Sequence, residues 1–465
     1  MISKTILGPP GTGKTWKIEQ LIKENGTEDY LYLTYNRSMA AMARERIGSD
    51  KHHVGTLHSV MASLNGIGPF VTRDDEKEFC ELYGLSRDSG SADSDTGESD
   101  WERFSRYYDM VVNTMRKPYQ PVTEKMSMRY LFDKWKNFKK KIGKFDYTDI
   151  LEIASQNTYY KKFLFIDEAQ DLSPLMWKIV DNIDCENRYI VGDPHQSIYG
   201  FRGIDVREFV KRIGDYEILG ESHRYGDNLR KMSERALAGG KVMKMPYVGL
   251  GQTDIDRYTL RSMSQLDGSK AILCRTINLA RNIANRLPYA VVPINHDHGY
   301  GNGWGKTTFM VASIMRKWPK IDAEEFAWIV EHSPANLWVR GTKARVKREA
   351  TLFSYDMMKT RMGPQEIIDR LTIADNVKRN AKRMLVENIP TIYCDTIHAA
   401  KGLEFDHVML LLDLPQMIAD DMPPEEYRIL YVGMTRARKS IQFMDTGFYN
   451  GSYYIPGMSK TIYPL

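Results

Sequence analysis

The chain has 465 residues, 42% of them hydrophobic, so it is globular but too long for a single hydrophobic core, and we expect several packed domains. Its 65 lysines and arginines against 60 aspartates and glutamates leave a net charge of +5, a weak excess that permits nucleic-acid binding without demanding it. Four scattered cysteines argue against zinc, an iron–sulfur cluster or a disulfide framework, and no segment has the pattern of a membrane span or signal peptide.

The first motif follows a short apolar run at residues 6–7 and precedes an amphipathic stretch that begins at Trp16. Residues 8–15 fit the phosphate-binding pattern G-x-x-x-x-G-K-[ST]. In this pattern glycines let backbone N–H groups wrap a polyphosphate, the lysine reaches the outer phosphates, and the hydroxyl can hold Mg²⁺. We therefore predict a nucleotide site that includes Gly11, Thr12, Gly13, Lys14 and Thr15.

Short apolar runs alternate with helix-like stretches along both halves of the chain. Residues 30–33, 163–166 and 189–191 in the first half, and 271–274, 391–394 and 407–411 in the second, are typical of buried parallel strands. A stretch of different composition interrupts each half. We predict two α/β domains, each with a mainly helical insertion. Their expected bounds are 1–66 with 145–217 for the first, 67–144 for its insertion, 218–293 with 391–465 for the second, and 294–390 for its insertion.

Two acidic residues follow directly after one of the expected strands. Asp167 and Glu168 come after residues 163–166, at the carboxyl end of a strand, where parallel sheets collect their ligands. A nucleotide hydrolase needs one carboxylate to help hold Mg²⁺ and a second to orient or deprotonate the attacking water. We predict that Asp167 has the first role and Glu168 the second.

The strand at residues 189–191 leads into a segment that suits two ligands. Gln196 is placed to touch the terminal phosphate, and the aromatic side chains that follow it can meet a second ligand, so one segment can couple two sites. Phosphoryl transfer also needs positive charge beyond Lys14, and an arginine on a separate domain adds about 10³ to 10⁵ in rate only when the domains close. Arg224 and Arg436 are the candidates.

These segments, in this order, resemble the motifs of superfamily 1 helicases of the UvrD/Rep type. The resemblance covers both predicted α/β domains. It rests on the phosphate loop and on residues 33–42, 54–59, 167–171, 192–203, 222–224, 395–405 and 426–437.

The resemblance implies two RecA-like P-loop domains with ATP in the cleft between them and single-stranded DNA across their top. It assigns Arg224 and Arg436 to the terminal phosphate, Glu404 to the nucleotide sugar, and His223 to the place of an aromatic that stacks on the base. For the DNA strand it assigns the base-stacking groups Tyr35, Tyr199 and Phe201, and the backbone-contacting groups Thr34, Thr56, His58, Thr396 and His398. Stacking tolerates any base, which suits a motor that walks over arbitrary sequence.

From the resemblance we expect a DNA-stimulated ATP hydrolase, with ATP and Mg²⁺ as cofactors, that moves along single strands from 3′ to 5′ and unwinds DNA. The alternatives are an ATP-gated module that remodels protein–DNA complexes without strand separation, and an RNA helicase. Only seven residues precede Gly8, where the family usually carries an adenine-reading segment, so other nucleoside triphosphates stay open. We expect a soluble cytoplasmic monomer that acts on single strands and duplex junctions, and its compact build would suit a phage enzyme.

Two basic runs have an ambiguous meaning. Each is either a contact surface for nucleic-acid phosphates or an ordinary solvated helix face. The first run consists of Lys134, Lys136, Lys139, Lys140, Lys141 and Lys144, and the second of Lys343, Arg345, Lys347 and Arg348.

Overall fold

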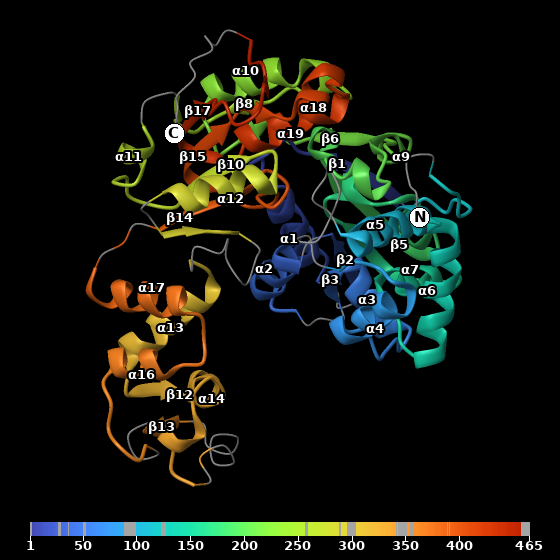
Figure 1. The fold of residues 1–465 in the computed structure, drawn as a ribbon. Helices are drawn as coiled ribbons and strands as arrows, with labels where there is room; N and C mark the ends of the chain where they lie inside the picture. The colour runs from blue at the N-terminus through green and yellow to red at the C-terminus, as the bar shows by residue number, and fades with distance from the viewer. Residues whose placement is uncertain are drawn as a thin grey trace. The chain divides into compact units, whose positions relative to one another are not determined.

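In the computed structural model the chain forms two compact units. Figure 1 labels the helices and strands described below. The first comprises residues 1–251 and 423–431, and the second comprises residues 252–422 and 432–465. Residues 218–251, which the sequence assigned to the second domain, are thus grouped with the first unit. The structure describes residues 2–26, 29–35, 37–49, 53–87, 99–121, 127–255, 259–287, 290–294, 304–340, 342, 351–353, 358–387, 389 and 391–456.

The first unit is built on a parallel sheet whose strand order is β3-β2-β4-β5-β1-β6. Its strands are β1 (Ile2–Leu7), β2 (Tyr30–Thr34), β3 (Val54–Thr56), β4 (Tyr159–Ile166), β5 (Ile183–Gly192) and β6 (Tyr216–Ile218). The predicted strands of the first half are confirmed, and because they are parallel their carboxyl ends meet at one edge of the sheet.

Alternate residues of these strands pack into two separate hydrophobic cores, as period-two side-chain geometry requires. Tyr30 and Tyr32 pack with residues of α1 (Lys14–Asn25) and α2 (Arg37–Ile47) on one face. Leu31 and Leu33 pack on the other face with residues of α3 (Leu57–Leu64), α7 (Tyr147–Ala154) and α8 (Pro174–Asp181). Burial on both faces explains why these strands read as continuous apolar runs.

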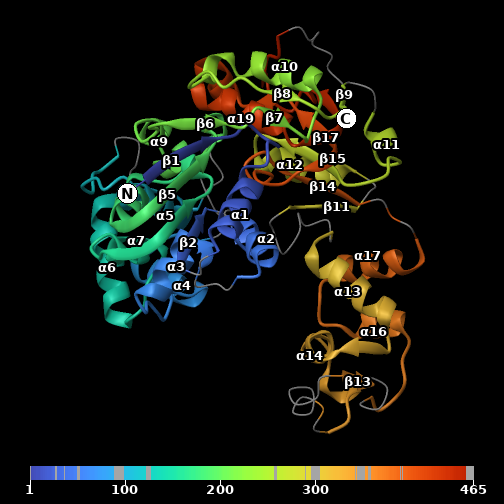
Figure 2. The same cartoon turned by 180° about the vertical axis from the view of Figure 1, so that it is seen from behind.

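The first insertion shares the second of these cores. Phe79, Phe104 and Trp135 belong to the same buried cluster as the sheet residues Leu31 and Leu164. They lie on helices α4 (Arg73–Tyr83), α5 (Asp100–Asn113) and α6 (Met128–Ile142), and Figure 2 shows α5, α6 and α7 gathered together. The remaining elements of the first unit are α9 (Val206–Val210), α10 (Asp227–Ala236), β7 (Glu221–Ser222), β8 (Val248–Gly249), and the short helices η1 (Ala169–Asp171), η2 (Pro194–Gln196), η3 (Gly200–Arg202) and η4 (Ala238–Gly240).

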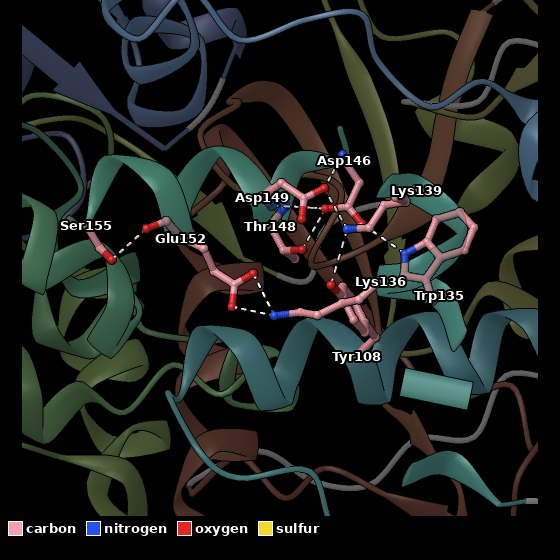
Figure 3. Close-up of polar contacts among 9 residues, drawn as sticks. All are labelled: Tyr108, Trp135, Lys136, Lys139, Asp146, Thr148, Asp149, Glu152 and Ser155. Carbon is pink, nitrogen blue, oxygen red and sulfur yellow. Dashed lines mark hydrogen bonds and ion pairs between the residues drawn. The ribbon is translucent and has the colours of Figure 1, made fainter. Parts of the chain in front are cut away.

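A buried lysine ties the insertion to the helix that follows it (Figure 3). Nζ of Lys139, on α6, lies 2.5 Å from Oδ2 of Asp146 and 2.6 Å from Oδ2 of Asp149. These two carboxylates also form the capping box of α7. Nε1 of Trp135 donates to Asp146 at 2.9 Å, and Tyr108 accepts from Lys139 at 3.2 Å. Every charge in the cluster therefore has partners.

The same contacts decide part of the question about the basic run. Lys136 pairs with Glu152 at 2.7 Å, and Lys144 pairs with Asp75 at 2.7 Å. Together with Lys139, these lysines are committed to carboxylates of the protein itself. Lys140 and Lys141 are exposed.

The second unit repeats the parallel architecture with the strand order β11-β14-β10-β15-β17-β9. Ile272, Ile392 and Met409 pack with residues of α12 (Ile277–Arg286) on one face of this sheet. The strands are β9 (Asp254–Ile255), β10 (Lys270–Cys274), β11 (Ala290–Val292), β14 (Thr391–Thr396), β15 (Phe405–Leu411) and β17 (Ala437–Met444). Around them lie α11 (Leu260–Met263), α12 (Ile277–Arg286), α18 (Gln416–Asp421), the antiparallel pair β16 (Asp413–Leu414) and β18 (Gly451–Ser452), and α19 (Pro424–Met434), which begins in the first unit. The predicted strands of the second half are confirmed.

The second insertion has a hydrophobic core of its own. Trp318, Phe326 and Trp338 are among its buried residues. Its elements are α13 (Lys306–Lys317), α14 (Ala323–Glu331), α16 (Pro364–Arg370), α17 (Asp375–Val386), the short helix η5 (Ala335–Leu337) and the antiparallel pair β12 (Lys320–Asp322) and β13 (Thr351–Phe353). The second basic run, residues 343–348, lies outside the described residues. Within the described part of the chain, no helix combines the length and apolarity of a membrane span.

Candidate active site

The phosphate loop connects β1 to α1 at the carboxyl edge of the first sheet. Gly11 and Gly13 have φ angles of 78° and 81°, a left-handed conformation that favours glycine. Nζ of Lys14 donates to the carbonyl oxygen of Gly8 at 2.8 Å, so the lysine folds back over the loop. A Cβ added to Gly8 would lie 2.4 Å from Cγ of Lys14. The glycines thus allow the close approach that the motif predicts.

A buried carboxylate lies next to the loop. Thr15 Oγ1 donates to Oδ2 of Asp167 at 2.9 Å, and the hydroxyl of Tyr32 donates to the same oxygen at 2.7 Å. Asp167 is fully buried, and this burial, followed by the negative charge of Glu168, raises its pKa to about 6. A divalent cation fits this donor set, because its positive charge would favour the ionised carboxylate beside a hydroxyl oxygen.

The second carboxylate is oriented by its backbone and by a glutamine. Glu168 has a φ of 54°, which is unusual for a non-glycine residue. Nε2 of Gln170 donates to Oε2 of Glu168 at 2.5 Å, and Oε1 of Gln170 accepts the backbone N–H of Asp193 at 2.9 Å. Asp193 in turn accepts from Nε2 of Gln196 at 2.7 Å. Glu168 and Gln196 are therefore joined by a buried hydrogen-bonded path that passes through the side chain of Gln170 and through the backbone and side chain of Asp193.

The segment that contains His223 and Arg224 packs against the phosphate loop. Oγ of Ser222 donates to the carbonyl oxygen of Pro10 at 2.7 Å. The backbone N–H of His223 donates to the carbonyl oxygen of Gly11 at 3.0 Å. A Cβ on Gly11 would lie 2.5 Å from Cβ of Arg224. Arg224 therefore neighbours the loop within one compact unit, and the His223 side chain is exposed.

The aromatic residues of the first unit that were predicted to stack on DNA bases form one cluster with an arginine. The rings of Tyr35 and Tyr199 are 5.4 Å apart, and those of Tyr199 and Phe201 are 6.1 Å apart. Arg202 donates to the Tyr35 hydroxyl at 2.7 Å and lies 5.6 Å and 5.7 Å from the centroids of the Tyr199 and Phe201 rings. Phe201 is 48% exposed, so part of the cluster faces solvent.

The polar residues predicted to contact the sugar–phosphate backbone of DNA have differing surroundings. Thr34 is buried at the end of β2. Thr56 is the N-cap of α3, where its hydroxyl accepts the backbone N–H of Ser59 at 3.2 Å. The ring of His58 packs edge-on against Tyr147 at 5.8 Å. Thr34 and Thr56 lie at carboxyl ends of neighbouring strands, on the same sheet edge as the phosphate loop.

The predicted residues of the second unit fall on two opposite edges of its sheet. Thr396 ends β14, and His398 follows it. Glu404 and Arg436 directly precede β15 and β17, whose first residues, Phe405 and Ala437, are partners in the sheet. Because all these strands are parallel, the two pairs lie at the carboxyl and amino edges respectively. The second sheet thus separates the proposed DNA contacts from the proposed nucleotide contacts.

Arg436 is held firmly inside the second unit. Its side chain is 1% exposed. Nε donates to the carbonyl oxygen of Val432 at 2.9 Å, and Nη1 donates to that of Leu403 at 3.1 Å. Glu404 lies 3.2 Å from Arg438 in an ion pair.

Comparison with known families agrees with this arrangement. Residues 3–202 match the model of an AAA domain, and residues 350–445 match that of the UvrD-like helicase C-terminal domain. The chain belongs to the UvrD/Rep type of superfamily 1 helicases. The two parallel sheets are the two RecA-like domains of this family.

Relatives of this UvrD-like chain carry helicase names. F-box DNA helicase 1 of Gallus gallus is 23% identical over 94% of the chain, and ATP-dependent DNA helicase Rep of Salmonella typhimurium is 30% identical over 25% of it. These matches span 46% and 18% of the relatives, so the chain covers less than half of each. Among solved structures, the PRRSV helicase has a TM-score of 0.36 at 11% identity, over 98% of this chain and 56% of that one.

Two polar residues of the UvrD-like site were missed from the sequence. Tyr32 carries a hydroxyl within a fully buried strand, and Gln170 lies inside the carboxylate motif itself. A hydroxyl in a fully buried strand needs a partner, and this requirement was the available signal for Tyr32. For Gln170 the signal was its place two residues after Glu168.

Proposed function

We propose that this chain is an ATP-dependent DNA helicase that translocates along single strands from 3′ to 5′ and separates the duplex ahead of it. The observation that carries the proposal is a continuous path of contacts. It runs from Glu168 through Gln170 and Asp193 to Gln196, and three residues later the chain reaches the cluster of Tyr199 and Phe201. Gln196, which would contact the terminal phosphate, and the aromatic residues Tyr199 and Phe201, which would contact DNA, thus belong to one segment.

For ATP hydrolysis, the position of each predicted site residue in the first unit supports a role. Lys14 and the loop glycines would bind the phosphates, and Thr15 and Asp167 would hold Mg²⁺, which neutralises charge on the phosphates when it is bound. Glu168 would orient and deprotonate the attacking water, with its carboxylate held by Gln170 at 2.5 Å. Arg224, beside the loop, would contact the terminal phosphate.

The second unit would complete the reaction. Arg436 would act as an arginine finger after a conformational change releases its guanidinium from the carbonyl oxygens of Val432 and Leu403. Glu404 would contact the nucleotide sugar and His223 its base. Hydrolysis would then report a cycle of domain closure and opening.

For the DNA, the proposal rests on stacking rather than on base reading. The half-exposed Phe201 with Tyr35 and Tyr199 offers aromatic faces, and each stacked base contributes about 1–3 kcal/mol whatever its identity. Thr34, Thr56, His58, Thr396 and His398 would contact the sugar–phosphate backbone. The relatives named DNA helicases support DNA as the substrate. The proposed direction rests on the similarity of residues 402–405 to a motif of the family.

The test is strand separation by the isolated chain with ATP on matched duplexes that carry a 3′ tail, a 5′ tail or no tail. We expect unwinding of the 3′-tailed duplex, and faster unwinding of the 5′-tailed duplex would overturn the direction. ATP hydrolysis stimulated by single strands without any unwinding would instead favour remodelling of protein–DNA complexes. Competition between DNA and RNA strands of the same sequence separates a DNA helicase from an RNA helicase.

A further inference from the structure

One face of helix α19 lies along the segment that joins Gln196 to the aromatic cluster. Oε1 of Glu425 accepts the backbone N–H of Gly200 at 2.7 Å. One turn later, Nε of Arg428 donates to the carbonyl oxygen of Ser197 at 2.8 Å.

A third contact follows one further turn along the helix. The ring of Tyr431 packs edge-on against His195, with ring centroids 6.1 Å apart. The spacing of three residues between Glu425, Arg428 and Tyr431 places them on one side of the helix. As α19 advances, its contacts step backward from Gly200 to His195, so the helix and the segment run in opposite directions.

The glycine at position 200 leaves room for the Glu425 carboxylate to approach the backbone. A Cβ on Gly200 would lie 2.5 Å from Oε2 of Glu425. Gly200 also separates Tyr199 from Phe201, the two aromatic residues proposed to stack on the DNA strand. The carboxylate is therefore bonded to the backbone between them.

The two hydrogen bonds hold residues 197 and 200, the two ends of the stretch between Gln196 and Phe201. A conformational change at Gln196 would reach Phe201 through this stretch. Ser197 follows Gln196, which is hydrogen-bonded to Asp193, and Gly200 precedes Phe201. A segment fixed at both points moves as one piece, whereas a loose segment would let the aromatics shift without moving Gln196. The same helix continues to Met434, two residues before Arg436.

We propose that Glu425 and Arg428 are positioning residues that splint residues 195–200 to α19, and that this splint sets how strongly single-stranded DNA stimulates ATP hydrolysis. The inference rests on the proposed function and extends it. Neither residue touches the phosphate loop or the carboxylates of the active site in the contacts given above, so the splint acts on coupling rather than on the chemical step.

The experiment compares Glu425→Ala with Glu425→Gln, which keeps an oxygen acceptor for the Gly200 N–H. ATP hydrolysis is measured without DNA and with a saturating thymidine oligonucleotide. Loss of one charge-assisted hydrogen bond is on the order of a tenfold effect, so Glu425→Ala should lower the DNA-stimulated kcat about tenfold while basal kcat stays unchanged. Glu425→Gln should recover most of the stimulation. Asp421→Ala, an exposed carboxylate at the end of α18, is the charge control and should behave as wild type.

A second readout does not depend on DNA. Hydrogen exchange of a peptide covering residues 195–203 should quicken in Glu425→Ala and return toward the wild-type rate in Glu425→Gln. Unchanged exchange together with unchanged stimulation, or an equal fall of basal and stimulated rates, would overturn the splint. Wild-type protein that binds DNA strands without any stimulation would instead refute the proposed function, while the exchange measurement would still report whether the splint exists.

Arg428→Ala checks the other bond independently. It should also reduce the stimulation and quicken exchange near Ser197, with basal kcat unchanged. If Glu425→Ala lowers the melting temperature enough to perturb folding, the comparison between Arg428→Ala and Arg428→Lys decides, because lysine lacks the Nε donor that contacts Ser197. Full stimulation in both Arg428 variants would contradict the proposal.

Discussion

Gln170 donates from Nε2 to Oε2 of Glu168 at 2.5 Å, and through its other amide atom it accepts the backbone N–H of Asp193. Gly192 allows this approach, because a Cβ there would lie 2.5 Å from Oε1 of Gln170. The proposed catalytic carboxylate is thus oriented by a side chain anchored to the end of the next strand, and two motifs separated in sequence share one hydrogen-bonded unit.

Replacing Gln170 by glutamate should change the pH dependence of ATP hydrolysis. A second carboxylate at this position repels the negative charge of Glu168 and favours its protonated form. We therefore expect the acid limb of the kcat profile to move to higher pH in Gln170→Glu. Gln170→Ala should lower kcat without that shift. Profiles that overlay for wild type and Gln170→Glu would show that the amide does not govern Glu168.

Glu168→Gln should separate nucleotide binding from turnover. The amide keeps the size of the side chain but cannot accept a proton from water, and general-base catalysis contributes about 10² to 10⁴ in rate. We expect kcat to fall by about that factor while the dissociation constant for a fluorescent ATP analogue stays unchanged. Normal hydrolysis by this variant would remove Glu168 from its assigned role.

Gly11 and Gly13 form a matched pair for testing the contact with Arg224. Both have positive φ, so alanine at either position costs roughly 1–2 kcal/mol of backbone strain. Only at Gly11 would the new Cβ lie within 2.5 Å of Arg224, whereas at Gly13 the nearest atom is 3.9 Å away. Gly11→Ala should therefore lower the free energy of unfolding in urea by about 1–3 kcal/mol more than Gly13→Ala. Equal losses would mean that residues 222–224 yield easily.

From the lysine cluster of Figure 3 we predict that replacing two neighbouring lysines changes the free energy of unfolding by very different amounts. Lys139→Met would leave Asp146 and Asp149 without their common cation, and breaking a buried ion pair by removing one partner costs about 3–5 kcal/mol. Lys140→Met changes an exposed residue of the same helix and should stay within about 0.5 kcal/mol of wild type. Urea unfolding followed by tryptophan fluorescence would compare the two variants.

Asp75 and Lys144 should make stability depend on acid pH. The hydrogen bond from Lys144, followed by those from Thr72, lowers the pKa of Asp75 from 3.8 to about 2. A carboxyl whose pKa is lowered by folding stabilises the native state above its ordinary pKa, and this stabilisation disappears as pH falls through the native pKa. Lys144→Met should therefore reduce the melting temperature at pH 5 to 7, and its difference from wild type should shrink toward pH 2. A difference independent of pH would exclude this ion pair as the cause.

Much of the fold, and the local geometry of the candidate nucleotide site, could be predicted from the sequence because the signals are local. Residues 163–166 are apolar because the strand is covered on both faces, and the two acidic residues after them necessarily lie at the ligand-binding edge. The glycines at 11 and 13 mark positive φ angles in the same direct way. Such features depend on a few neighbouring residues, so they can be recognised in a single sequence.

The positions of other residues followed from contacts between distant parts of the chain. Glu425 and Gly200 are 225 residues apart, and Thr15 and Asp167 are 152 apart. The basic run of α6 shows the same limit, since Lys139 is a buried ion-pair partner and Lys140 an exposed residue one position later. Composition cannot distinguish them, because the helix orientation against Asp146 and Asp149 decides which lysine is buried.

By itself, the sequence determined the phosphate loop, the carboxylate pair and the alternation of buried parallel strands with helices, because short-range sterics and hydrophobic patterning specify them. Only the tertiary structure decided that Arg224 neighbours Gly11, that Gln170 holds Glu168, and that α19 lies along residues 195–200. The physical reason is that these side chains find their partners through packing between elements, which brings together groups that no local pattern relates.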